Sequence, residues 1–289
     1  MHLLPLYAGV SAEQQAAVFE PAPRGSRKVV VATNVAEASV TIDGIRYVVD
    51  CGFTKVKTYD AQLDMDVLAV VPESRAAAAQ RAGRAGRTAP GKCIRLFPES
   101  QLAALPRTSA PELVRCDLAP YLLQLKALGV ENVARFAFVP PAPSAQMVAQ
   151  GLEYLAALGA LDEHARLTRV GERLAEAPLP PPLARALLAA AEFGCAQEML
   201  TIAAMTTVAS PFTAFEYGPT MDVHAEVSRR KFVAEEGDHL TLLNVYNAFV
   251  HPRIGKQSPR WAARYSLNYA ALRRAHMIRG QLERCLLYT

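Results

Sequence analysis

The sequence predicts an α/β domain followed by a mainly α-helical region. Continuous β-branched runs separated by polar turns occupy roughly the first 100 residues, and long segments rich in Ala and Leu follow from about residue 105. The hydrophobic fraction of 51% is that of a folded chain, and no apolar run approaches the roughly 20 residues that a membrane-spanning helix needs. We therefore expect a globular protein without a signal peptide and without a membrane partner.

The first region should contain alternating strands and helices. We expect a helix after Ser11, a helix over 74–83, a β-hairpin over 53–72, and strands over 3–7, 27–33, 45–53 and 92–97. The unbroken apolar run at 27–33 is typical of a strand that is buried on both faces of a parallel sheet. This alternation predicts an open sheet whose binding site lies at the ends of the strands.

The region after residue 105 should be a succession of helices. Apolar periodicity and terminating glycines predict helices over 117–129, 144–160, 181–194, 196–208, 238–250 and, as a basic pair, about 258–287. Residues 161–171 predict a small two-stranded wing with a charged tip. Two Pro-rich joints divide the chain into residues 1–104, 105–176 and 177–289, and the middle part reads as a winged-helix module.

The spacing of the cysteines and histidines argues against a disulfide-stabilised protein and against a metal-dependent hydrolase. The five cysteines form no C-x-x-C pair, which argues against a disulfide framework and favours a reducing compartment. The six histidines lack H-x-x-x-H or H-x-x-E-H spacing, so we expect no metal site within this chain.

Basic residues are concentrated at the C-terminal end. Residues 251–289 contain eight basic residues and a single acidic residue, Glu283. Such a segment favours a polyanionic partner, and Arg273, Arg274 and Arg279 are the candidates for phosphate contacts. The alternative is a helix face whose arginines contact only solvent.

The motif that indicates chemistry is Gln80-Arg81-Ala82-Gly83-Arg84-Ala85-Gly86-Arg87. Arginine is always charged and its planar fork fits phosphate oxygens, while the intervening glycines allow a close approach of backbone to ligand. At a phosphoryl-transfer site arginine neutralises charge that develops on the γ-phosphate, and glutamine orients the attacking water. The alternative interpretation is an exposed Arg cluster that binds RNA or lipid.

The octet resembles motif VI of superfamily 2 helicases, and Thr33-Asn34-Val35-Ala36-Glu37-Ala38-Ser39-Val40-Thr41-Ile42 resembles their motif V. Further similarity runs through YVVDCGF at 47–53, GCAQEMLTIAAM at 194–205 and LNYAALRRAHMIRGQL at 267–282. The chain is thus similar to DEAH-box ATP-dependent RNA helicases of the splicing and ribosome-biogenesis type. The resemblance implies a second RecA-like domain, a winged helix and a helical ratchet (HA2) domain.

The resemblance also implies roles for single residues. Gln80, Arg84 and Arg87 match the catalytic groups at the γ-phosphate, and Thr41 and Asp43 match nucleotide contacts. Ser39 matches a residue that couples nucleotide to RNA, and Thr33 and Asn34 match contacts to the RNA backbone. Phe19 is the candidate for stacking on adenine, with a core residue at a helix end as the alternative.

The cofactors and partners implied are ATP with Mg²⁺, single-stranded RNA or a ribonucleoprotein, and an activator protein. No G-x-x-x-x-G-K-[ST] loop and no D-E-A-H box occur in these 289 residues, so the Mg²⁺ ligands are expected in an N-terminal RecA-like domain. We therefore interpret the chain as the C-terminal half of a longer helicase that lacks ATPase activity by itself. The resemblance implies nuclear residence, and cytoplasmic residence stays open. The rival interpretation is a binding module for RNA or a partner protein, without ATPase activity of its own.

Overall fold

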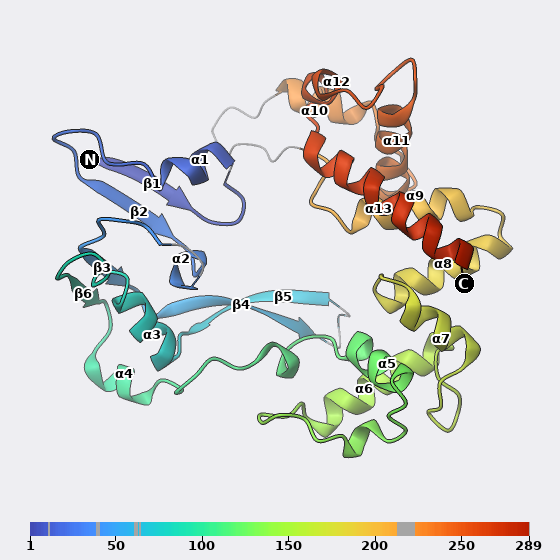
Figure 1. Cartoon of the computed structure of the whole chain (residues 1–289), viewed down its shortest axis with the longest axis horizontal. Coiled ribbons are helices and arrows are strands. Elements are labelled where there is room, and N and C mark those ends of the chain that lie inside the picture. Colours follow the sequence, from blue (N-terminus) through green and yellow to red (C-terminus); the bar gives the residue numbers. More distant parts are fainter. Residues whose placement is uncertain (11, 39–40, 61–62, 64, 213–222, 289) are drawn as a thin grey trace. The chain divides into compact units, whose positions relative to one another are not determined.

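The computed structural model describes every residue except 11, 39–40, 61–62, 64, 213–222 and 289. The chain forms two compact units (Figure 1). The first unit comprises Met1–Asp117 and Ala137–Ser144, and the second comprises Leu118–Phe136 and Ala145–Thr289.

The strands described in the first unit pair two by two. They are β1 (His2–Leu6), β2 (Lys28–Ala32), β3 (Tyr47–Asp50), β4 (Phe53–Asp60), β5 (Met65–Pro72) and β6 (Lys92–Arg95). β1 pairs with β2 and β3 pairs with β6, both in parallel, whereas β4 and β5 are antiparallel. Parallel pairing and the hairpin are therefore confirmed. The expected open sheet consists, within the described residues, of three separate strand pairs.

The prediction that the strand at 27–33 is buried on both faces is wrong. Val31 in β2 is 61% exposed, and Val49 in β3 is 64% exposed. The small core of this unit contains Leu4, Leu6 and Val18, and it covers only one side of β1 and β2. In β1 buried residues alternate with exposed ones, because the core covers only one of its faces.

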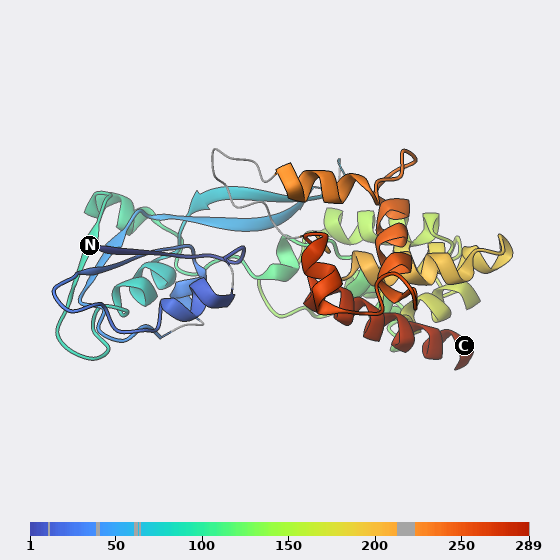
Figure 2. The ribbon, with the colours of Figure 1, turned by 90° about the horizontal axis from the view of Figure 1, so that it is seen from above.

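The hairpin is a long two-stranded ribbon in both views (Figures 1 and 2). Its register runs without a bulge from the pair Phe53–Pro72 to the pair Asp60–Met65. Arg115 holds one of its strands, because its carbonyl oxygen accepts from the Tyr59 N–H at 2.8 Å and its Nη1 donates to the Lys57 carbonyl at 2.5 Å. One backbone and one side-chain hydrogen bond thus attach β4 to Arg115.

Helices of the first unit are short. They are α1 (Ala12–Ala17), α2 (Val35–Ala38), α3 (Arg75–Ala82) and α4 (Glu99–Ala104), with a single 3-10 turn at Glu112–Val114. The helix expected over 74–83 is confirmed as α3. Ser11, the expected cap of α1, lies outside the described residues, and α2 and α4 were not expected from the sequence.

The second unit is built mainly of helices. They are α5 (Ala119–Ala127), α6 (Ala145–Ala157), α7 (Arg169–Glu176), α8 (Pro181–Glu192), α9 (Ala196–Thr206), α10 (Val223–Arg230), α11 (Asp238–Val250), α12 (Pro259–Arg264) and α13 (Tyr269–Tyr288), with a 3-10 turn at Val133–Arg135. All of the helices expected from the sequence are present, whereas α7 and α10 were not expected. In the described part of the chain, no helix combines the length and hydropathy required to cross a membrane.

The expected wing at 161–171 is shorter than predicted. A single antiparallel bridge joins Leu161 to Leu167, and the Asp162 carboxylate accepts from the backbone N–H groups of His164 and Arg166 at its tip. The chain then turns helical, because the Thr168 hydroxyl accepts from the Gly171 N–H and caps α7. Gly171 also lets α7 approach Ala160, since a Cβ there would lie 2.1 Å from the Ala160 carbonyl oxygen.

Helices α9, α11 and α13 form the centre of the second unit, and α13 lies alongside α9 in both views (Figures 1 and 2). A buried cluster that includes Met205, Phe249 and Leu272 joins these helices. Trp261 and Tyr265 pack against this cluster, with ring centroids 5.1 Å apart. Aromatic packing of this kind fixes α12 against the other helices.

Candidate functional site

Helix α3 positions the first half of the octet. The Ser74 hydroxyl caps its N-terminus by accepting from the Ala77 N–H at 3.1 Å. The first two backbone N–H groups of the helix, those of Arg75 and Ala76, have no acceptor within the helix and donate instead to the carbonyls of Pro106 and Arg107. With its beginning fixed in this way, the Ala-rich helix ends at Gly83 and places the three arginines at its end and in the following turn.

The structure brings the last two arginines of the octet, Arg84 and Arg87, to the motif V segment, residues 33–43. The half-buried Arg84 donates through Nη2 to the backbone carbonyl of Glu37. The Nη1 group of the exposed Arg87 donates to the hydroxyl of Thr41. Gln80 is exposed on α3. The two motifs, separated by some 40 residues in the sequence, are therefore in direct contact.

The motif V segment follows β2 as a turn and a single helical turn. Its Thr33 N–H donates to the Leu6 carbonyl, and the Glu37 N–H donates to the Asn34 carbonyl. Thr33, Asn34, Thr41 and Asp43 all have exposed side chains. Ser39 lies outside the described residues. The hydroxyl, amide and carboxyl groups of this short segment are exposed, so their hydrogen-bonding atoms are accessible to a polar ligand.

Phe19 lies directly after α1, and its side chain is 52% exposed. The alternative interpretation of Phe19 as a core residue is therefore wrong. The core position at this point of the chain belongs to its neighbour Val18, which is fully buried. The exposed ring is available for stacking on a planar ligand.

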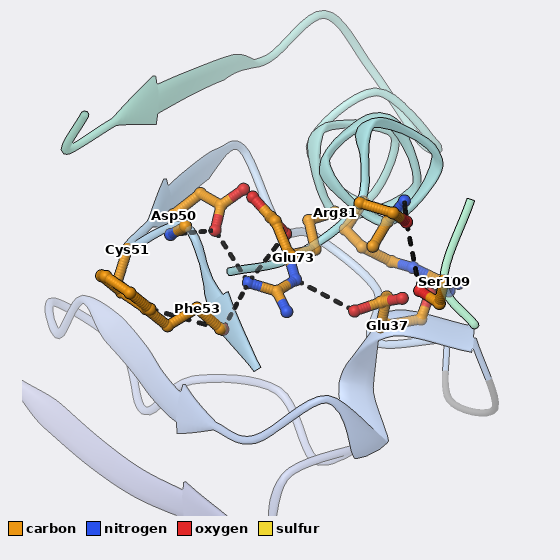
Figure 3. Close-up of polar contacts among 11 residues, drawn as sticks. Glu37, Asp50, Cys51, Phe53, Glu73, Arg81 and Ser109 are labelled. Carbon is orange, nitrogen blue, oxygen red and sulfur yellow. Dashed lines mark hydrogen bonds and ion pairs between the residues drawn. The ribbon is translucent and has the colours of Figure 1, made fainter. Parts of the chain in front are cut away.

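Sequence reasoning assigned no role to Arg81, the middle charge of a buried cluster. Its Nε lies 3.0 Å from Glu37 Oε2, and its Nη1 lies 2.9 Å from Asp50 Oδ1 and 3.0 Å from Glu73 Oε2. Nη1 also donates to the Phe53 carbonyl at 3.1 Å. Figure 3 shows the guanidinium between Glu37 on one side and Asp50 and Phe53 on the other. No signal within the octet singles out Arg81, because the three arginines are equally spaced and only Arg81 lies within α3 once the helix is known.

Burial changes the acidity of this cluster. The Glu73 and Asp50 side chains are fully buried. Desolvation, and secondly a hydrogen bond with the Asp50 carboxyl, raise the pKa of Glu73 to about 7, although Arg81 acts in the opposite direction. Near neutral pH the Glu73 carboxyl group is therefore protonated for part of the time.

The three candidate phosphate ligands of α13 fall into two groups. Arg273 and Arg274 are exposed. Arg279 instead faces α9, where its Nε donates to the Thr201 hydroxyl at 2.9 Å and its Nη2 donates to the Gln197 side chain. Its Nη1 also lies 3.4 Å from Glu283. The grouping of all three as free RNA ligands is thus corrected, because Arg279 is committed to contacts within the second unit.

Comparisons with known proteins agree with this arrangement. Residues 1–89 match the helicase conserved C-terminal domain, residues 151–179 the winged-helix helicase associated domain (HA2), and residues 180–242 the ratchet-like helicase associated domain (HA2). The resemblance to the C-terminal portion of DEAH-box RNA helicases is confirmed. Residues 33–43 and 80–87 both lie within the segment that matches the helicase conserved C-terminal domain.

Similar proteins match nearly the whole chain. The human protein named "Probable ATP-dependent RNA helicase DHX35" is 49% identical over 99% of this chain and 40% of its own length. Its Caenorhabditis elegans homolog is 47% identical over 98% of the chain and 38% of its own length. The Schizosaccharomyces pombe "Pre-mRNA-splicing factor ATP-dependent RNA helicase prp22" is 43% identical over 98% of the chain and 24% of its own length. The chain therefore spans two fifths or less of the relatives it matches.

Proposed function

We propose that this chain supplies the arginine side of the ATP site and part of the RNA-binding surface of an ATP-dependent RNA helicase. The observation that carries the proposal is the contact of Arg84 and Arg87 with the motif V segment. The names of the relatives support ATP and RNA as ligands. The name of the S. pombe relative supports a role in pre-mRNA splicing, and hence nuclear residence and a ribonucleoprotein as the proposed partner.

The residues of the first unit fit a nucleoside triphosphate. Arg87 is exposed and its fork points to a neutral hydroxyl, that of Thr41. Charged phosphate oxygens make stronger hydrogen bonds with guanidinium than a neutral hydroxyl does, so a γ-phosphate would displace Thr41 from Arg87. Arg84 and Arg87 then neutralise charge that develops in the transition state, and Gln80 orients the attacking water.

Coupling to RNA follows from the shortness of the motif V segment. Thr33 and Asn34 at its beginning are the proposed RNA contacts, whereas Thr41 and Asp43 at its end are the proposed nucleotide contacts. Glu37 lies midway along the segment. If Arg84 leaves the Glu37 carbonyl, the proposed contacts at both ends therefore change position together. Differential contacts of this kind let ATP hydrolysis shift the affinity for a single strand that is held by its backbone.

A chimera tests the proposal. In this chimera, residues 1–289 replace the matching segment of the human relative. We expect RNA-stimulated ATP hydrolysis and unwinding of a duplex with a single-stranded extension, both lost in the Arg84→Ala, Arg87→Ala variant. A folded chimera that binds single-stranded RNA but hydrolyses no ATP would overturn the proposal in favour of a binding module.

A further inference from the structure

We infer that Arg81 is a positioning residue that holds Arg84 in place through Glu37. This inference rests on the proposed function, because it concerns how a phosphate-facing arginine is oriented. Arg81 touches neither of the proposed ligands. Its effect passes through one intermediate residue, and each link in that path is a contact in the structure.

Glu37 is the intermediate because it binds both arginines with different groups. Its carboxylate accepts from Arg81 Nε at 3.0 Å, and its backbone carbonyl accepts from Arg84 Nη2. Both side chains of the first pair are largely buried, with 15% of Arg81 and 17% of Glu37 exposed. The position of the Glu37 backbone therefore sets where the Arg84 guanidinium lies.

Helix α2 requires such a tether. It is a single turn, Val35–Ala38, and one helical turn in isolation is unstable because nucleation fixes several residues for one hydrogen bond. Its backbone makes contacts of its own, from Ala36 to Thr33 and from Glu37 to Asn34. The buried ion pair with Arg81 attaches this turn to α3.

The other side of Arg81 is a rigid anchor. Asp50 accepts from the Gly52 N–H at 3.1 Å, and the Glu73 N–H donates to the Gly52 carbonyl at 3.0 Å. Gly52 has a φ of +79°, and a Cβ there would lie 2.6 Å from the Phe97 ring. These two hydrogen bonds connect the end of β3 and the residue after β5 through the tight turn at Gly52. The Arg81 side chain extends from this turn to Glu37 (Figure 3).

Stability alone does not account for the cluster. Three carboxyl groups surround one guanidinium, and the side chains of two of them, Asp50 and Glu73, are fully buried. Buried ion pairs often contribute no more stability than apolar side chains of similar volume, whereas they do impose one geometry. Here the fixed geometry includes the Glu37 backbone, whose carbonyl accepts the hydrogen bond from Arg84.

The test compares substitutions along this path in the chimera. Arg81→Lys keeps the charge but loses the fork that joins Glu37 to Asp50. Glu37→Ala removes the carboxylate and leaves the carbonyl, and Glu37→Gln restores an acceptor oxygen. We expect kcat to fall about 10- to 100-fold in Arg81→Lys and Glu37→Ala, with little change in KM for ATP, and partial rescue in Glu37→Gln. The matched control is Arg75→Lys on the exposed side of α3, which should leave kcat unchanged.

A double-mutant cycle separates positioning from general damage. If Arg81 acts through Arg84, Arg81→Lys should cause no further loss of kcat in an Arg84→Ala background. In residues 1–289 alone, hydrogen exchange at the Ala36 and Glu37 amides should be faster in Arg81→Lys, with exchange in α9 unchanged. Additive losses in the cycle, or unchanged exchange at these amides, would overturn the inference while leaving the proposed function intact. A parent chimera without ATPase activity would overturn the proposed function, and the exchange measurement would still decide whether the tether exists.

Discussion

Arginines at equal spacing in the octet occupy three different environments. Arg81 is largely buried among carboxylates, Arg84 is half-buried against a backbone carbonyl, and Arg87 is exposed beside a hydroxyl. The cost of displacing a guanidinium from its partner falls in that order, because a neutral, exposed partner is the weakest. Arg87 is therefore the arginine best placed to exchange its present partner for a phosphate.

Substitution of Arg87 tests this assignment. In the chimera, Arg87→Ala should lower kcat for ATP by about 10³-fold or more, the scale of a lost arginine finger. Affinity for single-stranded RNA without nucleotide should stay within about twofold of the parent, as measured by fluorescence anisotropy. A variant that keeps its ATPase activity but loses RNA affinity would show that the octet is an RNA-binding patch.

Glu73 gives the first unit a dependence on pH. Because its pKa is raised from 4.5 to about 7, the native state keeps a proton that the unfolded chain has already lost between these values. The free energy of unfolding should therefore fall as pH rises from about 5 to 7, by at most about 3 kcal/mol, and then level off. Glu73→Gln should remove this fall.

Urea unfolding at several pH values measures the effect, with circular dichroism as the signal. The lone Trp261 lies in the second unit, so its fluorescence reports that unit separately and should not respond to Glu73→Gln. Glu99→Gln, a substitution of an exposed carboxylate, is the matched control and should keep the parent's pH dependence. Parallel pH profiles for Glu73→Gln and the parent would contradict the role given to Glu73.

At the scale of elements, α13 presents one exposed face and one packed face. Arg273 and Arg274 are exposed, whereas Ala275 and Leu282 are buried and Arg279 is bonded to α9. A helix with one face in a core and the other exposed can bind a polyanion without disturbing its packing. The expected RNA contribution of the basic segment is therefore confined to its exposed arginines.

Salt dependence distinguishes the two groups of arginines. Each phosphate contact on a single strand contributes about 0.7 to the slope of log K against log salt. Replacing both Arg273 and Arg274 with Gln should flatten that slope by up to about 1.4 in residues 1–289, for single strands of unrelated sequence alike. Arg279→Gln should leave the slope unchanged and lower the free energy of unfolding of the second unit by about 1–2 kcal/mol, since it loses charged hydrogen bonds. An unchanged slope in the double variant, with its circular dichroism intact, would remove α13 from the RNA-binding surface.

At the scale of the whole molecule, the chain carries one side of the proposed chemistry. The phosphate-facing arginines belong to the first unit, and no G-x-x-x-x-G-K-[ST] loop occurs in these 289 residues to hold the β- and γ-phosphates. We expect purified residues 1–289 to hydrolyse ATP at the background rate, with or without RNA. RNA-stimulated hydrolysis that disappears in Arg87→Ala would show that the chain needs no further phosphate loop.

The sequence by itself determined the elements whose signals are local. Helix α3 follows from an alanine-rich run, the hairpin from alternation over residues 53–72, and the helices of the second unit other than α7 and α10 from apolar periodicity and terminating glycines. Each of these patterns is complete within a few turns or one hairpin, so no distant partner is needed to recognise it. The octet and the motif V segment were also identifiable, because they are contiguous.

Only the tertiary structure decided which charges are paired. The partners of Arg81 come from residues 37, 50 and 73, and those of Arg279 come from 197 and 201 as well as from its own helix. Nothing within the octet distinguishes Arg81 from Arg84 and Arg87 before the chain brings α2, β3 and the end of β5 together. The ion pairs of a buried arginine depend on which carboxylates the fold excludes from water, and that is a property of the packed molecule rather than of any segment.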